Sequence, residues 1–347
     1  MGMKRNKKKI MTFGETVLRL SPEHYKRFGQ ADKFQVFFGG AEANVAVSLS
    51  YMGFQTGYVT KLPENEMADA AIRYLDSFQV DTGHILRGGK RMGLFFMEQG
   101  VSLRPGKVIY DREHSAIAEA EPEEFDWEKI LKDAEWFHVT GISPALSDKM
   151  AVNCLEACKT AKKLGIMVSL DVNYRSSLWS TEKAGTYMDK LSHYVDLCFA
   201  NEEEIEQVYG IPSAVRGKAT ALGNHEVYGD MANELMRRYP FGQVALTLLD
   251  TISADQYRWQ AVVYDKEGEH YSRLYEAVRN VDRDGVGDAF SAGLIAGILS
   301  RENMKEAVEF GTAAAALKFS VEGDINLVRY EEVEQLAGKG NSIDVKR

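Results

Sequence analysis

Cysteine is scarce in this sequence: among 347 residues only Cys154, Cys158 and Cys198 occur. Three cysteines cannot form a disulfide framework, and their scarcity is typical of a protein from a reducing compartment. Cys154 and Cys158 are four residues apart in an expected helix, but no histidine or further cysteine joins them at the spacing of a metal ligand. The sequence therefore favours neither a disulfide scaffold nor a zinc centre.

The chain also lacks an excess of positive charge and any long apolar run. The formal net charge is -9, which argues against nucleic acid or an anionic membrane as the main partner, because both attract basic surfaces. No stretch approaches the ~18 consecutive apolar residues of a membrane span, and the basic residues 4–9 are not followed by the apolar segment of a secretory signal. We therefore expect a cytoplasmic protein that meets any anionic ligand with local cations and backbone amides.

Short apolar segments alternate along the chain with longer segments of helical periodicity. This alternation predicts an α/β fold in which a parallel sheet is covered on both faces and binds ligands at the carboxyl ends of its strands. The expected strands are 9–13, 56–60, 136–140, 166–171, 197–201 and 244–248, and the expected helices include 41–52, 66–78, 149–164, 224–238 and 313–318.

Two helix-poor regions, at about 15–36 and 92–111, interrupt this alternation. The second contains two strand-like stretches around a turn at Pro105-Gly106. No linker rich in proline or serine separates these regions from the rest. We therefore expect one domain over residues 8–335, with the two insertions forming a small β-sheet that acts as a lid.

Residues 282–288 (DRDGVGD) directly precede an apolar run with helical spacing. Gly285 and Gly287 let backbone N–H groups converge, and the helix start adds unpaired N–H groups and a partial positive charge, so an anion would be held there. We expect Asp288 at the first helical position, where the helix dipole favours its ionised form and lets it accept a proton from a hydroxyl. The pattern predicts phosphoryl transfer to an alcohol. The alternative is a tight turn in which Asp288 only caps a helix.

A second motif lies far upstream, at residues 38–46 (FGGAEANVA). It resembles the N-terminal signature of the PfkB/ribokinase family of sugar kinases, and residues 282–290 resemble that family's C-terminal signature. The resemblance extends over nearly the whole chain and is closer to one branch, the 2-keto-3-deoxygluconate kinases. The stretches similar to that branch are 12–22, 108–112, 171–179 and 323–328.

The resemblance implies a ribokinase-like three-layer fold, in which helices flank a central, mainly parallel sheet and a small β-sheet lid closes over the sugar. Because the lid often makes the dimer contact in this family, we expect a homo-oligomer, either a dimer through the lid or a larger assembly.

Tyr110 and Arg112 are two residues apart, so on a lid strand they share one face and can meet the same ligand. The planar fork of an arginine suits the carboxylate of a keto acid sugar; the alternative is a surface strand whose side chains cover apolar area. Phe95 stands where the branch has a tyrosine, which removes one hydroxyl contact. The substrate-binding residues implied by the resemblance are Gly39, Gly40, Asn44, Phe95, Tyr110, Arg112 and Arg175.

The resemblance also implies the nucleotide and metal sites. Asp288 would be the base, with the amides of Gly285, Val286 and Gly287 stabilising the transferring phosphoryl group. Arg283 and Val286 replace the usual threonine and alanine, and a monovalent cation such as K⁺ is a possible further cofactor. The residues implied for ATP are Asn201, Thr247, Gly285 and Gly287, and those for Mg²⁺, through water, are Asn201 and Glu204. Asn201 and Glu204 also have the spacing of a helix cap, which stays open as an alternative.

The resemblance as a whole implies ATP-dependent phosphorylation of the 6-hydroxyl of 2-keto-3-deoxygluconate. The partners would then be a sugar acid and ATP. Two alternatives remain at this point: a kinase for another sugar, such as fructose, tagatose or a related keto-deoxy acid, or a sugar-sensing protein that kept the fold and lost catalysis.

Overall fold

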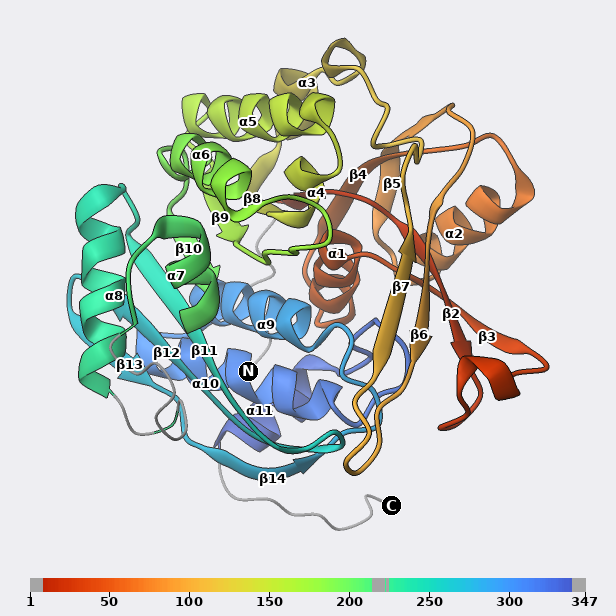
Figure 1. Ribbon diagram of the computed structural model, residues 1–347. Helices are drawn as coiled ribbons and strands as arrows, with labels where there is room; N and C mark the ends of the chain where they lie inside the picture. The colour runs from red at the N-terminus through yellow and green to blue at the C-terminus, as the bar shows by residue number, and fades with distance from the viewer. Residues whose placement is uncertain (1–8, 214–221, 223–224, 339–347) are drawn as a thin grey trace.

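The computed structural model describes residues 9–213, 222 and 225–338, and within them a large sheet forms the centre of the molecule (Figure 1). Its parallel part has the strand order β5-β4-β1-β8-β9-β10-β11, and the antiparallel strand β12 continues it, pairing with both β13 and β14. The parallel strands are β1 (Lys9–Phe13), β4 (Thr56–Leu62), β5 (Asp81–Arg87), β8 (Ala134–Thr140), β9 (Met167–Asp171), β10 (Leu197–Ala200) and β11 (Gln243–Ser253). The antiparallel strands are β12 (Gln256–Asp265), β13 (Gly268–Tyr271) and β14 (Tyr275–Arg279).

Helices cover both faces of the sheet, as the alternation of apolar segments predicted. One apolar core lies between the sheet and the helices α3 (Trp127–Leu131), α4 (Ile142–Ala145), α5 (Asp148–Lys163), α6 (Thr181–Ser192), α7 (Glu202–Tyr209) and α8 (His225–Arg238). The other face is covered by α1 (Ala41–Tyr51), α2 (Glu66–Ser77), α9 (Val286–Ser300), α10 (Met304–Lys318) and α11 (Tyr330–Gly338). In the described part of the chain, none of these helices combines the length and apolarity needed to cross a bilayer.

Helix α5 explains the two cysteines four residues apart. The Ser147 side chain caps the helix by accepting a hydrogen bond from the amide of Met150. Met150, Cys154, Ala157 and Cys158 follow at helical spacing and are all buried in the core. Cys154 and Cys158 are therefore small apolar core residues, with free thiols whose pKa values burial raises.

A small sheet of strand order β3-β2-β6-β7 stands at the right of the large sheet (Figure 1). It is built from the two helix-poor segments, which confirms the prediction of a second, smaller sheet. Strands β2 and β6 run parallel, and the other two pairs are antiparallel. The strands are β2 (Val17–Pro22), β3 (Phe34–Gly39), β6 (Gly93–Glu98) and β7 (Lys107–Asp111), and the chain also forms two short 3-10 turns, Phe28–Gln30 and Pro122–Glu124.

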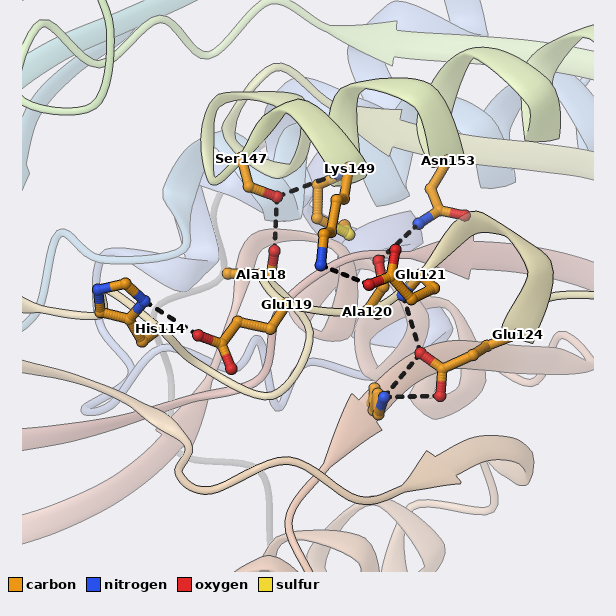
Figure 2. A network of polar contacts seen from close by, with 11 residues as sticks. His114, Ala118, Glu119, Ala120, Glu121, Glu124, Ser147, Lys149 and Asn153 are labelled. Atoms are coloured by element: carbon orange, nitrogen blue, oxygen red, sulfur yellow. Dashed lines mark hydrogen bonds and ion pairs between the residues drawn. The ribbon is translucent and has the colours of Figure 1, made fainter.

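The segment 113–124, which returns the chain from the small sheet to the large one, is fixed on α5 (Figure 2). The Ser147 hydroxyl donates a hydrogen bond to the carbonyl of Ala118 at 2.5 Å, so the residue that caps α5 also holds this segment. Lys149, in the first turn of α5, forms an ion pair with Glu121 at 2.5 Å. The small sheet is thus anchored at its C-terminal end to the core of the domain.

The strand order of the large sheet changes direction between β1 and β8. From β1 the chain proceeds to β4 and β5 on one side, whereas from β8 it proceeds to β9, β10 and β11 on the other. In a parallel sheet such a reversal leaves a crevice at the carboxyl ends of the strands, where ligands bind. Both the start of α1 and the start of α9 lie at this crevice.

Candidate active site

A cavity of about 1230 Å³ lies between the carboxyl edge of the large sheet and the small sheet. This volume exceeds the usual size of a pocket for one small ligand. Among the residues that line it, the sequence predicted Gly40, Asn44, Phe95, Tyr110, Arg112, Arg175, Asn201, Glu204, Thr247, Gly285, Val286, Gly287 and Asp288. Gly39 is the one predicted residue that does not line it.

The two glycines of the 282–288 segment have different roles. Gly285 is the N-cap of α9 with φ of 76°, and a Cβ on it would lie 1.8 Å from the carbonyl oxygen of Asp324. Only glycine fits that position, because the backbone is left-handed and the neighbouring chain is in contact. Gly287 lies within the first turn of α9, and a Cβ on it would meet no atom within 4 Å. Gly287 therefore leaves open space in the cavity at the start of α9, where the amide of Val286 donates to the carbonyl of Arg283 at 3.3 Å and the next amides have no partner within the helix.

Asp288 is the third residue of α9, so the expectation that it occupies the first helical position was wrong. Its side chain is buried and accepts a hydrogen bond from the Asn44 amide group at 2.8 Å. Burial raises the pKa of Asp288 to about 7, and the charges of Asp171 and Glu42 add to this rise. The hydrogen bond from Asn44 and the charge of Arg175 oppose the rise. Burial of Asp288 thus opposes the ionised form that the helix dipole was expected to favour.

Glu42 is a further buried carboxyl beside Asp288 that the sequence reasoning did not single out. One of its oxygens accepts hydrogen bonds from the amide and hydroxyl of Thr140 and from the hydroxyl of Ser143, all between 2.8 and 3.0 Å. These bonds join the first turn of α1 to the end of β8. Burial raises the pKa of Glu42 in spite of them.

Asp171, Asn173 and Arg175 all line the cavity after the end of β9. Asn173 has φ of 38° and donates from its backbone and side-chain amide groups to Asp171, so the chain turns directly after β9. Burial and the charge of Glu204 raise the pKa of Asp171 to about 8, whereas Arg175 lowers it. Within the described residues, the only hydrogen bond of the Arg175 guanidinium goes to the carbonyl of Tyr174, at 3.1 Å, which leaves most of its donors available for a ligand.

Asn201 and Glu204 form a helix-capping box at the start of α7. The Asn201 side chain accepts from the amide of Glu204 at 2.9 Å, and the Glu204 side chain accepts from the amide of Asn201 at 3.0 Å. The other Glu204 oxygen accepts from the amide of Tyr174 at 3.1 Å. Burial raises the pKa of Glu204 to about 7, and Arg175 opposes the rise. The capping alternative is therefore present, and both side chains still face the cavity with oxygen atoms.

On the small sheet, Tyr110 and Arg112 lie together as predicted, with the Arg112 guanidinium 5.6 Å from the centre of the Tyr110 ring. Phe95 is the cross-strand neighbour of Tyr110, and their ring centres are 6.0 Å apart. Arg112 is also ion-paired with the buried carboxylate of Glu15, with Nε 2.7 Å from Oε2. The other oxygen of Glu15 has no hydrogen-bond partner within the described residues.

A buried cluster of charges supports the 282–288 segment from behind. The Arg19 guanidinium of β2 pairs with Asp282 at 2.8 Å, with Asp324 at 2.6 Å and with Asp284 at 3.4 Å. Gly39, at the end of β3, packs against this cluster, since a Cβ on it would lie 2.2 Å from the Asp324 carboxylate. Gly39 is therefore required by packing behind the cavity.

At the far end of the cavity two hairpin tips are in contact. Thr247 lines the cavity from β11, and the Arg283 guanidinium lies 5.2 Å from the ring centre of Tyr257 on β12. Ser102, between β6 and β7, accepts a hydrogen bond from the amide of Ala254 at 2.8 Å and donates its own amide to Asp255 at 3.1 Å. The small sheet thus extends along the cavity from Tyr110 and Arg112 to the β11–β12 hairpin.

Comparisons with known proteins cover nearly the whole chain. A model described as pfkB family carbohydrate kinase matches residues 7–329. A 2-dehydro-3-deoxygalactonokinase of Haloferax volcanii is 32% identical over 96% of this chain and 98% of its own length. A 2-dehydro-3-deoxygluconokinase of Bacillus subtilis is 27% identical over 91% of each chain. The crystal structure of a 2-dehydro-3-deoxygluconokinase of Thermotoga maritima is similar with a TM-score of 0.91 at 45% identity, covering 96% of this chain and 100% of that one.

Proposed function

The chain belongs to the pfkB family of carbohydrate kinases, and on this basis we propose that it transfers the γ-phosphoryl group of ATP to the 6-hydroxyl of 2-keto-3-deoxygluconate. The observation that carries the proposal is Asp288. It is a buried carboxyl held by Asn44 at the start of α9, next to the left-handed turn at Gly285, in a cavity large enough for two substrates. The name 2-dehydro-3-deoxygluconate, used for two of the similar proteins, denotes the same sugar acid.

In this reaction a bond forms between the sugar oxygen and the γ-phosphorus, the bond to the β-phosphate oxygen breaks, and ADP leaves. Asp288 takes the proton of the hydroxyl, a role that fits a pKa of about 7. The amides of Gly285 and Gly287 would meet the charge that develops on the phosphoryl oxygens. The amide of Val286, which was expected to join them, donates to the carbonyl of Arg283 at 3.3 Å. The Arg175 guanidinium, whose only hydrogen bond among the described residues goes to the Tyr174 carbonyl, would meet the same group.

The side chains at the start of α7 fit a hydrated magnesium ion. Asn201 and Glu204 offer oxygen atoms to the cavity, and Mg²⁺ keeps several of its waters and needs few direct protein ligands. The ion would neutralise charge on the nucleotide phosphates. Burial raises the pKa values of Asp171 and Glu204, and a cation beside them would favour their ionised forms.

Arg112 would bind the carboxylate of the sugar acid, and Tyr110 would line the same end of the cavity. We expect Arg112→Ala to raise the KM for 2-keto-3-deoxygluconate about 10- to 100-fold, since a charge-assisted hydrogen bond contributes roughly 1.5–3 kcal/mol. The KM for a neutral sugar should barely change. Arg112→Lys, which keeps the charge but lacks the planar fork, should be intermediate.

The matched control is Arg91→Ala. Arg91 also pairs with a carboxylate of the small sheet, that of Asp111 at 2.7 Å, but it does not line the cavity. A thermal melt of each variant separates loss of binding from loss of folding. An unchanged KM for the acid in a folded Arg112→Ala variant would remove Arg112 from the carboxylate site.

One observation favours a second candidate, a kinase for a neutral sugar such as fructose or tagatose. Glu15 already neutralises Arg112, and a substrate carboxylate would have to share the guanidinium with it. A neutral sugar would instead present hydroxyl groups to this pair. Preference for the neutral sugar in a competition assay would select this candidate.

The small sheet is also the proposed dimer contact. Strand register places Val36, Leu20, Phe96 and Ile109 in one row on the face that points away from Arg19 and Phe95. Val36, at one end of this row, is 51% exposed and Ile109, at the other end, is 54% exposed, and an apolar row that reaches the surface at both ends is a candidate contact between subunits. We expect Ile109→Lys to shift a dimer toward the monomer in size-exclusion chromatography with light scattering. A wild-type monomer would contradict this.

A further inference from the structure

A set of paired charges surrounds the segment that forms the start of α9, and its three carboxylates also line the cavity. Arg19 is completely buried and is ion-paired with Asp282, Asp284 and Asp324. Its Nε donates to the hydroxyl of Ser21 at 2.8 Å. One guanidinium from the small sheet therefore joins the segment before Gly285 to the loop that contains Asp324.

Lys318, the last residue of α10, enters the same region from the other side and is also completely buried. Its ammonium group donates to the backbone carbonyl of Asp282 at 3.2 Å and to that of Val321 at 3.0 Å. The Asp282 carboxylate in turn accepts from the amide of Gly323 at 2.9 Å and from the amide of Asp284 at 3.2 Å. Asp282 is thus held at its carbonyl by Lys318 and at its carboxylate by Arg19 and two amides.

The charges of this cluster matter for an anion bound at the start of α9. Three carboxylates, those of Asp282, Asp284 and Asp324, would repel a phosphate there if they stood alone. Arg19 and Lys318 offset most of that charge. Burial lowers the pKa of Lys318, but the same three carboxylates oppose the fall. The ammonium is therefore the form of Lys318 that its neighbours favour.

The same arrangement bears on the monovalent cation expected from the sequence. Potassium binds in proteins to clusters of backbone carbonyl and carboxylate oxygens. Behind the 282–288 segment these oxygens already contact a protein cation: the carbonyls of Asp282 and Val321 contact Lys318, and the carboxylates contact Arg19. A further cation among them would lie beside two buried positive charges, so the residues present do not fit one.

We propose that Lys318 and Arg19 are built-in cations which hold the 282–288 segment in place, and that the ammonium of Lys318 replaces a monovalent metal ion at the carbonyls of Asp282 and Val321. Lys318 is thus a positioning residue for the amides at the start of α9. The effect of Lys318 on the rate of phosphoryl transfer rests on the proposed kinase function. The consequence for cation binding does not.

The first test uses the wild-type protein in about 100 mM potassium chloride and in tetramethylammonium chloride of equal ionic strength, so that screening is the same. We expect the rate of ADP release with 2-keto-3-deoxygluconate to differ by less than about twofold between the two salts. The melting temperature without ATP and sugar should also be the same in both. A stimulation above about tenfold, or a melting temperature raised only by potassium, would show a bound metal ion and overturn the proposal.

The second test removes the ammonium. Lys318→Ala leaves a space lined by the carbonyls of Asp282 and Val321. In tetramethylammonium chloride we expect its rate of ADP release to be at least about tenfold lower than that of the wild type, as for loss of a preorganised polar contact. Potassium or ammonium ions should restore part of the rate and raise the melting temperature of this variant. Lys318→Met fills the space with apolar atoms and should respond to neither ion.

Lys305→Met is the matched control. Lys305 is on the same helix and also donates to a backbone carbonyl, that of Tyr271, but it is at the surface. This variant should behave as the wild type in both salts. Full activity of Lys318→Ala in tetramethylammonium would overturn the positioning role. If Lys318→Ala fails to fold, the melting temperatures of the wild type in potassium chloride and in tetramethylammonium chloride still decide between a built-in and a bound cation. This comparison does not depend on which sugar is the substrate.

Discussion

Replacing the two glycines of the 282–288 segment by alanine, one at a time, should have different effects: Gly285→Ala should lose stability, and Gly287→Ala should keep stability and lose activity. For Gly285→Ala, the left-handed φ of 76° costs about 1–2 kcal/mol in a residue with a Cβ. The new Cβ would also lie 1.8 Å from the Asp324 carbonyl, and displacing that backbone adds about 1–3 kcal/mol. We therefore expect Gly285→Ala to lower the free energy of unfolding by about 2–5 kcal/mol.

For Gly287→Ala, the new Cβ meets no protein atom within 4 Å, and alanine is the better helix former by up to about 1 kcal/mol. The variant should be as stable as the wild type or slightly more so. The Cβ projects into the cavity where we propose that the phosphoryl group passes. The rate of ADP release should therefore fall by roughly 100-fold, as when one stabilising donor is lost.

Equilibrium unfolding in urea of the ligand-free variants, together with a coupled ADP-release assay, measures both effects. A stable but inactive Gly287→Ala beside a destabilised Gly285→Ala is the predicted pair. Equal stability of the two would refute the assignment of Gly285 as the left-handed cap. Wild-type activity of Gly287→Ala would refute the position of the phosphoryl group.

Two further predictions concern Asp288 and the hairpin contact. Because burial raises the pKa of Asp288 from 3.8 to about 7, kcat/KM should rise with pH through about 7 and then level off, as measured in a pH–rate profile. The folded state holds this proton more tightly than the unfolded chain, so the free energy of unfolding should fall as pH rises from about 4 to 7. Urea titrations over this pH range should show a smaller fall for Asp288→Asn. An equal fall in the variant and the wild type would contradict the raised pKa of Asp288. Asp255→Ala removes the acceptor for the Ser102 amide at the hairpin contact. The KM for the sugar should rise about fivefold, which corresponds to the free energy of one net hydrogen bond, and the melting temperature should change little. An unchanged KM would show that the hairpin contact does not contribute to sugar binding.

Elements with strong local signals could be predicted from the sequence. The expected strand 9–13 is β1 (Lys9–Phe13), and the expected helix 41–52 is α1, which ends one residue earlier at Tyr51. β1 is a short apolar run buried at consecutive positions, and α1 is a longer run whose residues 42–49 are all buried, so length rather than period distinguishes the strand from the helix. Each helix-poor insertion contributes a pair of strands that no α-helix interrupts, β2 with β3 and β6 with β7. Strands β2 and β6 then join the two pairs, although α1 and α2 lie between them in the chain.

Features that depend on tertiary contact could not be predicted. Arg19 and Asp324 are 305 positions apart, and an arginine in an apolar strand gives no local sign of a buried ion pair. The pairing of Glu15 with Arg112 is hidden for the same reason. The error over the helical position of Asp288 has a local cause: the sequence contains two nearby glycines and does not tell which of them adopts the left-handed conformation that starts α9.

The most direct test of the central claim is ADP release by the wild-type protein over a panel of sugars. The panel should contain 2-keto-3-deoxygluconate, its galactonate analogue, fructose and tagatose, with Asp288→Asn as the inactive control. We predict ADP release with the keto-deoxy acids, a phosphate on their 6-oxygen, and a loss of several orders of magnitude in Asp288→Asn. Absence of ADP release with every sugar, or near wild-type turnover of a folded Asp288→Asn, would contradict the account.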